Sequence, residues 1–213
     1  MIDTIIFDGE GIVFDSEAAW DQGQIEFLGR RGITYEREDL KPLLTGRSLV
    51  EGVQVMQKVY RLEGDPVELA KERLSIVRHC FAQGVNFIPE FSEFYEKVRN
   101  NYKTCLATSL ATELLTIVET TLNLKGLFAN NIFSIADVNN IGKPQPDLFL
   151  FAAEKLHTKV ENCLVIEDAP LGIEAAKRAG MKCIALTTTY RKEKLSQADL
   201  VVDHYREIDL EKL

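Results

Sequence analysis

Six short runs of apolar and often β-branched residues recur along the chain, separated by stretches with helical periodicity. Because these runs are almost continuously hydrophobic, they indicate strands buried on both faces of a parallel sheet. Pro146 before one amphipathic segment and Gly180 after another predict helices between the later strands. We therefore expect an α/β fold, a doubly wound, Rossmann-like parallel sheet. The predicted strands are residues 4–7, 104–108, 131–136, 163–167, 183–187 and 199–202.

One interval, between the first and second predicted strands, contains helix signals and no convincing strand. Ser16 is placed to cap a helix that reaches about Arg31. Ser48 with Glu51 forms a capping-box pattern, and Asp65 with Pro66 and Glu68 forms another. We interpret residues 15–88 as an inserted all-helical cap domain. Residues 1–14 and 89–213 then form the α/β core domain, with a core helix from about Pro89.

Composition and charge exclude several classes of protein. The 213 residues are 46% hydrophobic and 27% charged, as in ordinary globular domains. A net charge of −8 without any basic run argues against nucleic acid or an anionic membrane as partner. No apolar stretch approaches the roughly 20 residues that span a bilayer, and the N-terminus shows no export signal. Four cysteines without metal-site spacing favour reduced, buried thiols, and we expect a cytoplasmic monomer.

Polar side chains follow four of the predicted strands at the point where each strand ends. Because ligands bind at the carboxyl ends of the strands in open α/β sheets, we expect these side chains to share one site. Several carboxylates that lie close together require a cation, and oxygen ligands favour Mg²⁺. Aspartyl-phosphate chemistry then becomes possible, with an ammonium and a hydroxyl to stabilise the transferring group. The first strand ends in Asp8 and Glu10, the second in Thr108 and Ser109, and the fourth in Glu167 and Asp168; the third leads through Asp137 to Lys143.

Four segments, in order, resemble the motifs of the haloacid dehalogenase superfamily. They are "FDGEGIVFDSE", "LATS", "GKPQPDLF" and "VIEDAPLGIEAAKRAG". The resemblance spans essentially the whole chain and is greatest to the β-phosphoglucomutase and phosphoglycolate-phosphatase-like branch, in which a helical cap follows the first motif. Each motif alone is a weak signal, but four in order are specific.

The resemblance implies roles for individual residues. Asp8 matches the nucleophile that accepts the phosphoryl group, and Glu10 occupies the place of the general acid and base, whose backbone carbonyl also binds Mg²⁺. Thr108 matches the second-motif hydroxyl and Lys143 the third-motif lysine. Asp168, with Glu167, matches the acids that hold the metal; the metal set is thus Asp8, Glu10, Glu167 and Asp168.

Two residues are candidates for substrate binding, each with an ordinary structural alternative. Ser109 lies beside Thr108, but both could cap the helix that begins near Ala111. Arg47, in the "TGRS" segment of the insert, could reach the substrate from the cap or remain an exposed side chain. Trp20 could line the entrance of the site, and we expect it to serve in packing and not in substrate recognition.

The first motif departs from the family at Gly9 and Glu10, because the family usually has an apolar residue and then Asp there. The Glu carboxylate lies one methylene further out, and displacements near 1 Å can cost about a hundredfold in rate. Glu10 therefore leaves two readings open: a compromised site, or a site rebuilt around the longer side chain. A carboxyl group at this position favours phosphate esters over dehalogenation.

Three functions follow from this set of residues. We predict a Mg²⁺-dependent phosphatase that hydrolyses a small phosphorylated metabolite through an aspartyl-phosphate. The alternative is a phosphosugar mutase, but Ser16, Trp20 and Leu49 stand where β-phosphoglucomutases carry Thr, His and Arg. A third reading, motivated by Glu10, is a protein that binds phosphometabolites with little or no turnover. Phosphoacceptor receiver domains share the acidic cluster but are much shorter and lack a cap-sized insert.

Overall fold

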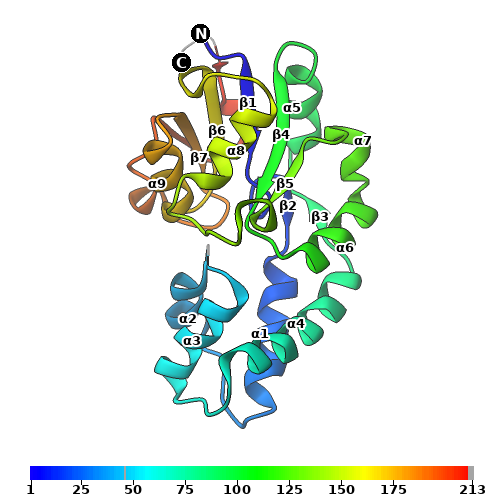
Figure 1. Ribbon diagram of the computed structural model, residues 1–213, viewed down its shortest axis with the longest axis vertical. Helices are drawn as coiled ribbons and strands as arrows, with labels where there is room; N and C mark the ends of the chain where they lie inside the picture. The colour runs from blue at the N-terminus through cyan, green and yellow to red at the C-terminus, as the bar shows by residue number, and fades with distance from the viewer. Residues whose placement is uncertain (46, 211–213) are drawn as a thin grey trace.

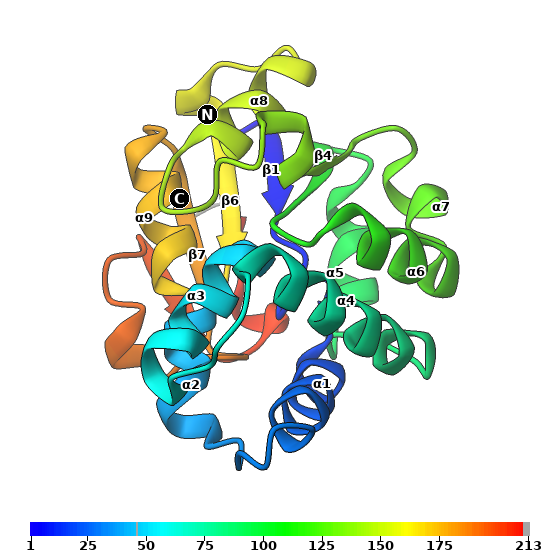
Figure 2. The same cartoon turned by 60° about the horizontal axis from the view of Figure 1, so that its bottom comes forward.

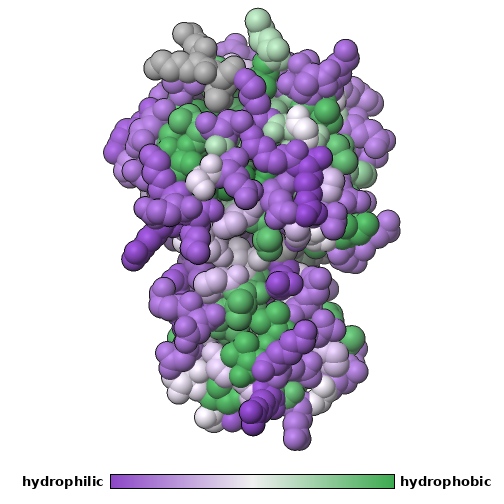
Figure 3. Space-filling view, turned by 90° about the vertical axis from the view of Figure 1, so that its left-hand side faces the viewer, coloured by the Kyte–Doolittle hydropathy of each residue, from purple (hydrophilic) through white to green (hydrophobic). Residues whose placement is uncertain are grey.

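The computed structural model describes residues 1–45 and 47–210 and shows two lobes (Figure 1). The larger lobe holds a six-stranded sheet with helices on both faces, and the smaller lobe consists of helices α1–α4. A space-filling view shows the two lobes meeting at a narrower waist (Figure 3). No helix in the described ranges is long and apolar enough to cross a bilayer.

The sheet is parallel throughout and has the strand order β5-β4-β1-β6-β7-β8. β1 lies near its centre, and all four residues of β1 are buried, as the apolar pattern predicted. The expected strands 131–136 and 199–202 are shorter in the structure. The bounds are β1 Thr4–Phe7, β4 Lys103–Thr108, β5 Ile132–Ser134, β6 Cys163–Glu167, β7 Lys182–Leu186 and β8 Leu200–Val202.

Successive residues of β1 point to opposite faces of the sheet, and each face has its own apolar core. Ile5 and Phe7 pack in the core with α5 (Phe91–Val98), α6 (Thr112–Leu122) and α7 (Leu124–Phe128). Ile6 packs on the other side with α8 (Asp147–Lys155) and α9 (Pro170–Arg178). Helices on both faces confirm the doubly wound α/β prediction (Figure 1). Short 3₁₀ turns occupy Ile135–Val138, Val160–Asn162, Lys192–Lys194 and Tyr205–Glu207.

The smaller lobe contains four helices with a separate apolar core that includes Phe27, Val53 and Met56. Both expected start signals are present: Ser48 and Glu51 form a reciprocal capping box, and the Asp65 side chain accepts bonds from two backbone amides. The expected cap at Ser16 is wrong, because its hydroxyl makes no capping bond and donates to Glu10 instead. The helices are α1 Glu17–Gly29, α2 Arg37–Leu44, α3 Leu49–Tyr60 and α4 Pro66–Ala82.

A two-stranded antiparallel ribbon connects the lobes. It pairs β2 (Phe14–Asp15) with β3 (Asn86–Phe87), where the chain leaves the sheet lobe and where it returns. The sequence pattern missed both strands, because two residues are too few to show a period. The cap boundaries at 15 and 88 stay a prediction. Figure 2 shows β1 and β6 pointing towards the helices of the smaller lobe, so the strand ends face that lobe.

Candidate active site

A cavity of about 610 Å³ lies between the two lobes. Side chains from β1, β4, β6 and the loop before α8 form its floor, while α1–α4 and their connections supply the opposite wall. All eight residues singled out in the sequence line this cavity: Asp8, Glu10, Arg47, Thr108, Ser109, Lys143, Glu167 and Asp168. The structure therefore brings them together, while the role of each stays a prediction.

The floor of the cavity carries a buried cluster of three carboxylates and one ammonium. Oxygen atoms of Asp8, Glu167 and Asp168 lie within 4.8 Å of one another. Lys143 Nζ donates to Asp8 Oδ1 and to Glu167 Oε1, the latter at 2.5 Å. The four side chains are at most 9% exposed. With all groups ionised, three negative charges against one positive charge leave a net charge of −2, which one divalent cation would balance.

The protonation of this cluster reflects its burial. Desolvation raises the pKa of Asp8 to about 7, partly opposed by the neighbouring Lys143. Burial, together with the charge of Glu167, also raises the pKa of Asp168 well above its ordinary value. Burial alone would lower the pKa of Lys143, but Asp8 and Glu167 hold it above its ordinary value. The carboxylates thus lack sufficient positive charge for full ionisation at neutral pH.

Glu167 and Asp168 occupy different positions although they are adjacent in sequence. Glu167 Oε1 binds Lys143, and its Oε2 accepts from the backbone amides of Asp168 and Ala169 at 2.7 and 2.8 Å. Asp168 accepts a bond from the Thr189 side chain and approaches the backbone of the first motif. The φ of Gly11 is +76°, and a Cβ there would lie 1.9 Å from Asp168 Oδ2. Gly11 therefore allows the carboxylate to lie against the Asp8 loop.

The Glu10 side chain extends from this floor towards the smaller lobe. Its Oε1 accepts from Ser16 Oγ at 2.6 Å and from Trp20 Nε1. Trp20 lines the cavity and also packs edge-on against Phe81, so the expected packing is present, and a role in recognition stays untested. Burial raises the pKa of Glu10 above its ordinary value. Both donors reach one oxygen, which fixes the direction of the carboxyl group.

The two hydroxyl residues after β4 differ in their bonding. Thr108 Oγ1 accepts from the Leu110 amide at 3.1 Å, so it caps the following turn as one reading expected. A Cβ at Gly9 would lie 2.7 Å from Thr108 Oγ1, which explains the absence of a larger residue there. Ser109 Oγ is buried and has no hydrogen-bond partner in the described part of the chain. An unpartnered buried hydroxyl at a cavity wall is suited to bind an oxygen-rich ligand.

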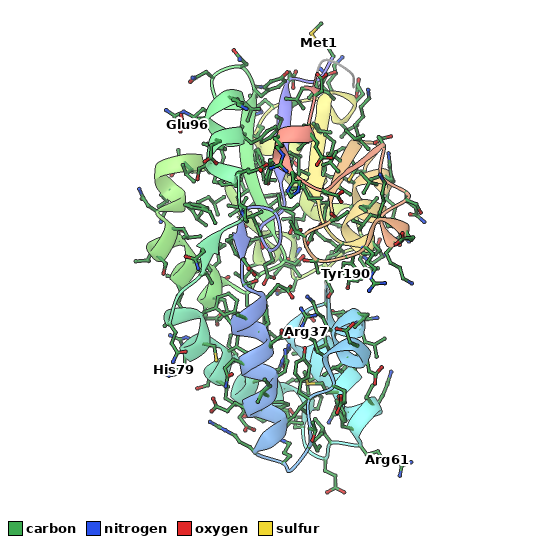
Figure 4. The ribbon with its side chains drawn as sticks, turned by 180° about the vertical axis from the view of Figure 1, so that it is seen from behind. Met1, Arg37, Arg61, His79, Glu96 and Tyr190 are labelled. Atoms are coloured by element: carbon green, nitrogen blue, oxygen red, sulfur yellow. The ribbon has the colours of Figure 1, made fainter. Side chains whose placement is uncertain are left out.

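The smaller lobe contributes the wall opposite the acidic cluster. Arg47 lines the cavity, and its Nε donates to the Leu43 carbonyl at 2.8 Å while the side chain stays exposed. Arg37 is paired with Glu17 and Asp21 at 2.8 and 2.7 Å, and Figure 4 shows it in the smaller lobe, with Tyr190 labelled in the sheet lobe.

Sequence reasoning missed Arg73, a buried arginine of α4 that lines the same cavity. Its Nε donates to Gln24 Oε1 at 3.0 Å, and its guanidinium lies 5.0 Å from the Trp20 ring centroid. A signal was present in the sequence. Arg73 falls between the buried pairs Leu69–Ala70 and Ile76–Val77, on the apolar stripe of the helix, where a charge is exceptional.

Comparison with known proteins identifies the family of the chain. The profile of the haloacid dehalogenase-like hydrolases matches residues 5–186. The chain belongs to this family, and it is a hydrolase. Among solved structures, a haloacid dehalogenase family IA variant 3 hydrolase from Entamoeba histolytica superposes with a TM-score of 0.84 at 23% identity, covering 99% of this chain and 97% of that one. This likeness confirms the fold.

Two curated relatives extend the comparison. Fructose-1-phosphate phosphatase YqaB from Escherichia coli K12 is 27% identical over 180 residues, 84% of this chain and 94% of its own length. Protein SUPPRESSOR OF QUENCHING 1, chloroplastic, from Arabidopsis thaliana is 30% identical over 205 residues. The match covers 92% of this chain but only 19% of that protein.

Proposed function

We propose that the protein is a Mg²⁺-dependent phosphatase that hydrolyses a small phosphorylated metabolite through an aspartyl-phosphate. The observation that carries the proposal is a buried cluster in which three carboxylates, of Asp8, Glu167 and Asp168, face the single ammonium of Lys143. When all four groups are ionised, the cluster has a net charge of −2. A phosphate monoester is a dianion, so it cannot approach this cluster without a bound cation. The name of the related fructose-1-phosphate phosphatase supports a small sugar-like substrate.

The carboxylates of Asp8 and Asp168, with the Glu10 backbone carbonyl, would hold the cation. Mg²⁺ suits this set because all the ligands are oxygens. When bound, it neutralises the carboxylates and the incoming phosphate. Glu167 is better placed to orient Lys143, because both of its oxygens already accept hydrogen bonds within the described residues.

The chemistry then follows from the contacts of the chain's own side chains. Asp8 Oδ1 is held by Lys143, which leaves Oδ2 to attack phosphorus while the bond to the leaving alkoxide breaks. Glu10, protonated through its Oε2, gives its proton to that alkoxide. Water next attacks the aspartyl-phosphate, Glu10 takes its proton, and inorganic phosphate leaves. Ser109 Oγ and Lys143 Nζ stabilise the charge on the transferred oxygens.

A test uses the purified protein with p-nitrophenyl phosphate and a panel of sugar phosphates, with phosphate release as the readout. We expect turnover that requires Mg²⁺ and stops with EDTA. Asp8→Asn should lower kcat by about a thousandfold or more, because the attacking group is lost. The matched control is Glu113→Gln, which removes a carboxylate from the cavity rim outside the cluster and should leave turnover intact.

The outcomes separate the functions. Free phosphate in equal amount to the dephosphorylated product indicates the phosphatase. Conversion of one sugar phosphate into an isomer without phosphate release would instead indicate the mutase. Tight binding without turnover across the whole panel would show the binding protein and overturn the proposal.

A further inference from the structure

The smaller lobe places a buried cation in the cavity without a counterion. Arg73 is 4% exposed and forms no ion pair with a carboxylate anywhere in residues 1–45 and 47–210. Its Nε is bound to Gln24, a neutral side chain, and neither Nη atom has a hydrogen-bond partner in the same ranges. Burial of an unpaired charge is costly, so such a group calls for an anion.

The surroundings of Arg73 hold the guanidinium in place. Gln24 from α1 fixes the Nε edge, and the Trp20 ring stacks against the planar group. On α3, Gly52 leaves room for the other edge, because a Cβ there would lie 3.1 Å from Nη1. Three helices therefore shape a rigid pocket around a fork of donors, which is the arrangement that recognises oxyanions with two parallel hydrogen bonds.

The carboxylates near this pocket already have partners. Glu10, whose charge raises the pKa of Arg73, accepts hydrogen bonds from Ser16 and Trp20. Glu17 binds Arg37 and Lys41, and Asp21 binds Arg37 and the Tyr35 hydroxyl. Burial lowers the pKa of Arg73 to about 10, so it stays protonated at neutral pH. An anion that reaches Arg73 would not have to displace a carboxylate of the protein.

We propose that Arg73 binds a second oxyanion, a carboxylate or a phosphate, at the end of the substrate opposite the transferred phosphoryl group. The substrate class is then a sugar-sized phosphate ester with an additional acidic group, such as a phosphosugar acid or a sugar bisphosphate. The inference rests on the proposed function for the phosphoryl end. It adds a specificity-determining residue on the opposite wall of the same cavity.

Binding measurements test this independently of turnover. Calorimetry on the Asp8→Asn protein with Mg²⁺ compares two pairs of compounds: 6-phosphogluconate with glucitol 6-phosphate, and fructose 1,6-bisphosphate with fructose 1-phosphate. The members of each pair differ in one acidic group. We expect the acidic member of at least one pair to bind about 30-fold or more tightly, as for a buried charge pair. The carboxylate and phosphate pairs show which oxyanion the pocket takes.

Two variants test whether Arg73 causes the preference for the acidic compounds. Arg73→Gln should remove most of this preference, because it lowers the binding affinity of the acidic compounds and leaves that of the neutral compounds unchanged. Gln24→Glu gives Arg73 a carboxylate partner with little change of shape, so it should have the same effect in a protein whose packing is preserved. The control is Arg30→Gln, which removes an exposed arginine paired with Glu26 outside the cavity. Melting temperatures of all three variants monitor folding.

The possible results are decisive. A preference that persists in Gln24→Glu, or an equal loss for acidic and neutral compounds in both variants, makes Arg73 a structural residue and overturns the inference. The inference is also overturned if the Asp8→Asn protein, with Arg73 and Gln24 unchanged, binds both members of each pair equally tightly. If the protein with Asp8 unchanged shows no phosphatase turnover but the binding preference is present, the result counts against the proposed reaction and not against the role of Arg73.

Discussion

At the level of single residues, three glycines allow side chains of the site to approach closely. Gly9 allows Thr108 to approach the Asp8 loop, and Gly11 does the same for Asp168. Gly172, on α9, lies under Glu167, because a Cβ there would be 1.7 Å from Glu167 Oε1. Each glycine therefore leaves room for one side chain of the site, and two of them, Gly11 and Gly172, do so for carboxylates of the cluster.

The contacts of Glu10 favour the reading of a site rebuilt around the longer side chain. Ser16 and Trp20 both donate to Oε1, and both come from the segment that leads into the smaller lobe. A shorter carboxylate could not keep both donors without movement of α1. We therefore expect Glu10→Asp to lower the hydrolysis rate by about 10- to 100-fold, measured as kcat on p-nitrophenyl phosphate.

Trp20→Phe is the companion variant, because it keeps a ring for the edge contact with Phe81 but removes the N–H donor. It should lower kcat more than it raises KM. If Glu10→Asp instead hydrolyses the substrate faster than the parent enzyme, Glu10 compromises the site, and the site is not rebuilt around the longer side chain.

At the level of elements, burial explains which parts of the fold and site were predictable. The strands of the sheet are buried on both faces, so their apolar runs mark them in the sequence. The sequence was sufficient to predict three residues of the site from the order of the strands and the spacing of the motifs: Asp8, Lys143 and Asp168. Arg73 and the partners of Glu10 depend on how α1 packs against α4, and no local pattern encodes that packing.

The α1–α4 contact yields a prediction about stability. A Cβ at Gly23 would lie 2.5 Å from Val77 Cγ2, so the helices approach closely at this point. Gly23→Ala should destabilise the protein by about 1–3 kcal/mol through overpacking, less the roughly 1 kcal/mol gained in helix propensity. Val77→Ala alone should cost about 2 kcal/mol by leaving a cavity.

The double variant should be at least about 1 kcal/mol more stable than the sum of the two changes, because the new methyl group occupies the vacated space. Urea unfolding monitored by circular dichroism gives the free energies of unfolding. Strict additivity would mean that the helices shift apart and do not hold this contact.

At the level of the whole molecule, the acidic cluster couples stability to pH and to metal. Burial raises the pKa of both Asp8 and Asp168, so these two groups bind more protons in the folded protein than in the unfolded chain above about pH 4. The stability of the metal-free protein should therefore fall as pH rises from about 4 to 7. Asp168→Asn removes one of the unbalanced charges and should be more stable than the parent at pH 8 without metal.

Magnesium should reverse this loss, because it binds the ionised carboxylates and competes with protons. At a concentration about 100 times its Kd, the stabilisation is about 2.7 kcal/mol, or roughly 5–10 °C in Tm for a chain of this size. Thermal unfolding with Mg²⁺ or EDTA should show the full shift at pH 8 and a smaller one at pH 5. Asp168→Asn should reduce the shift, and Glu113→Gln should preserve it. Equal shifts in Tm at both pH values would show that the metal binds outside this cluster. Only carboxyl groups with raised pKa values make the metal compete with protons between pH 5 and 8.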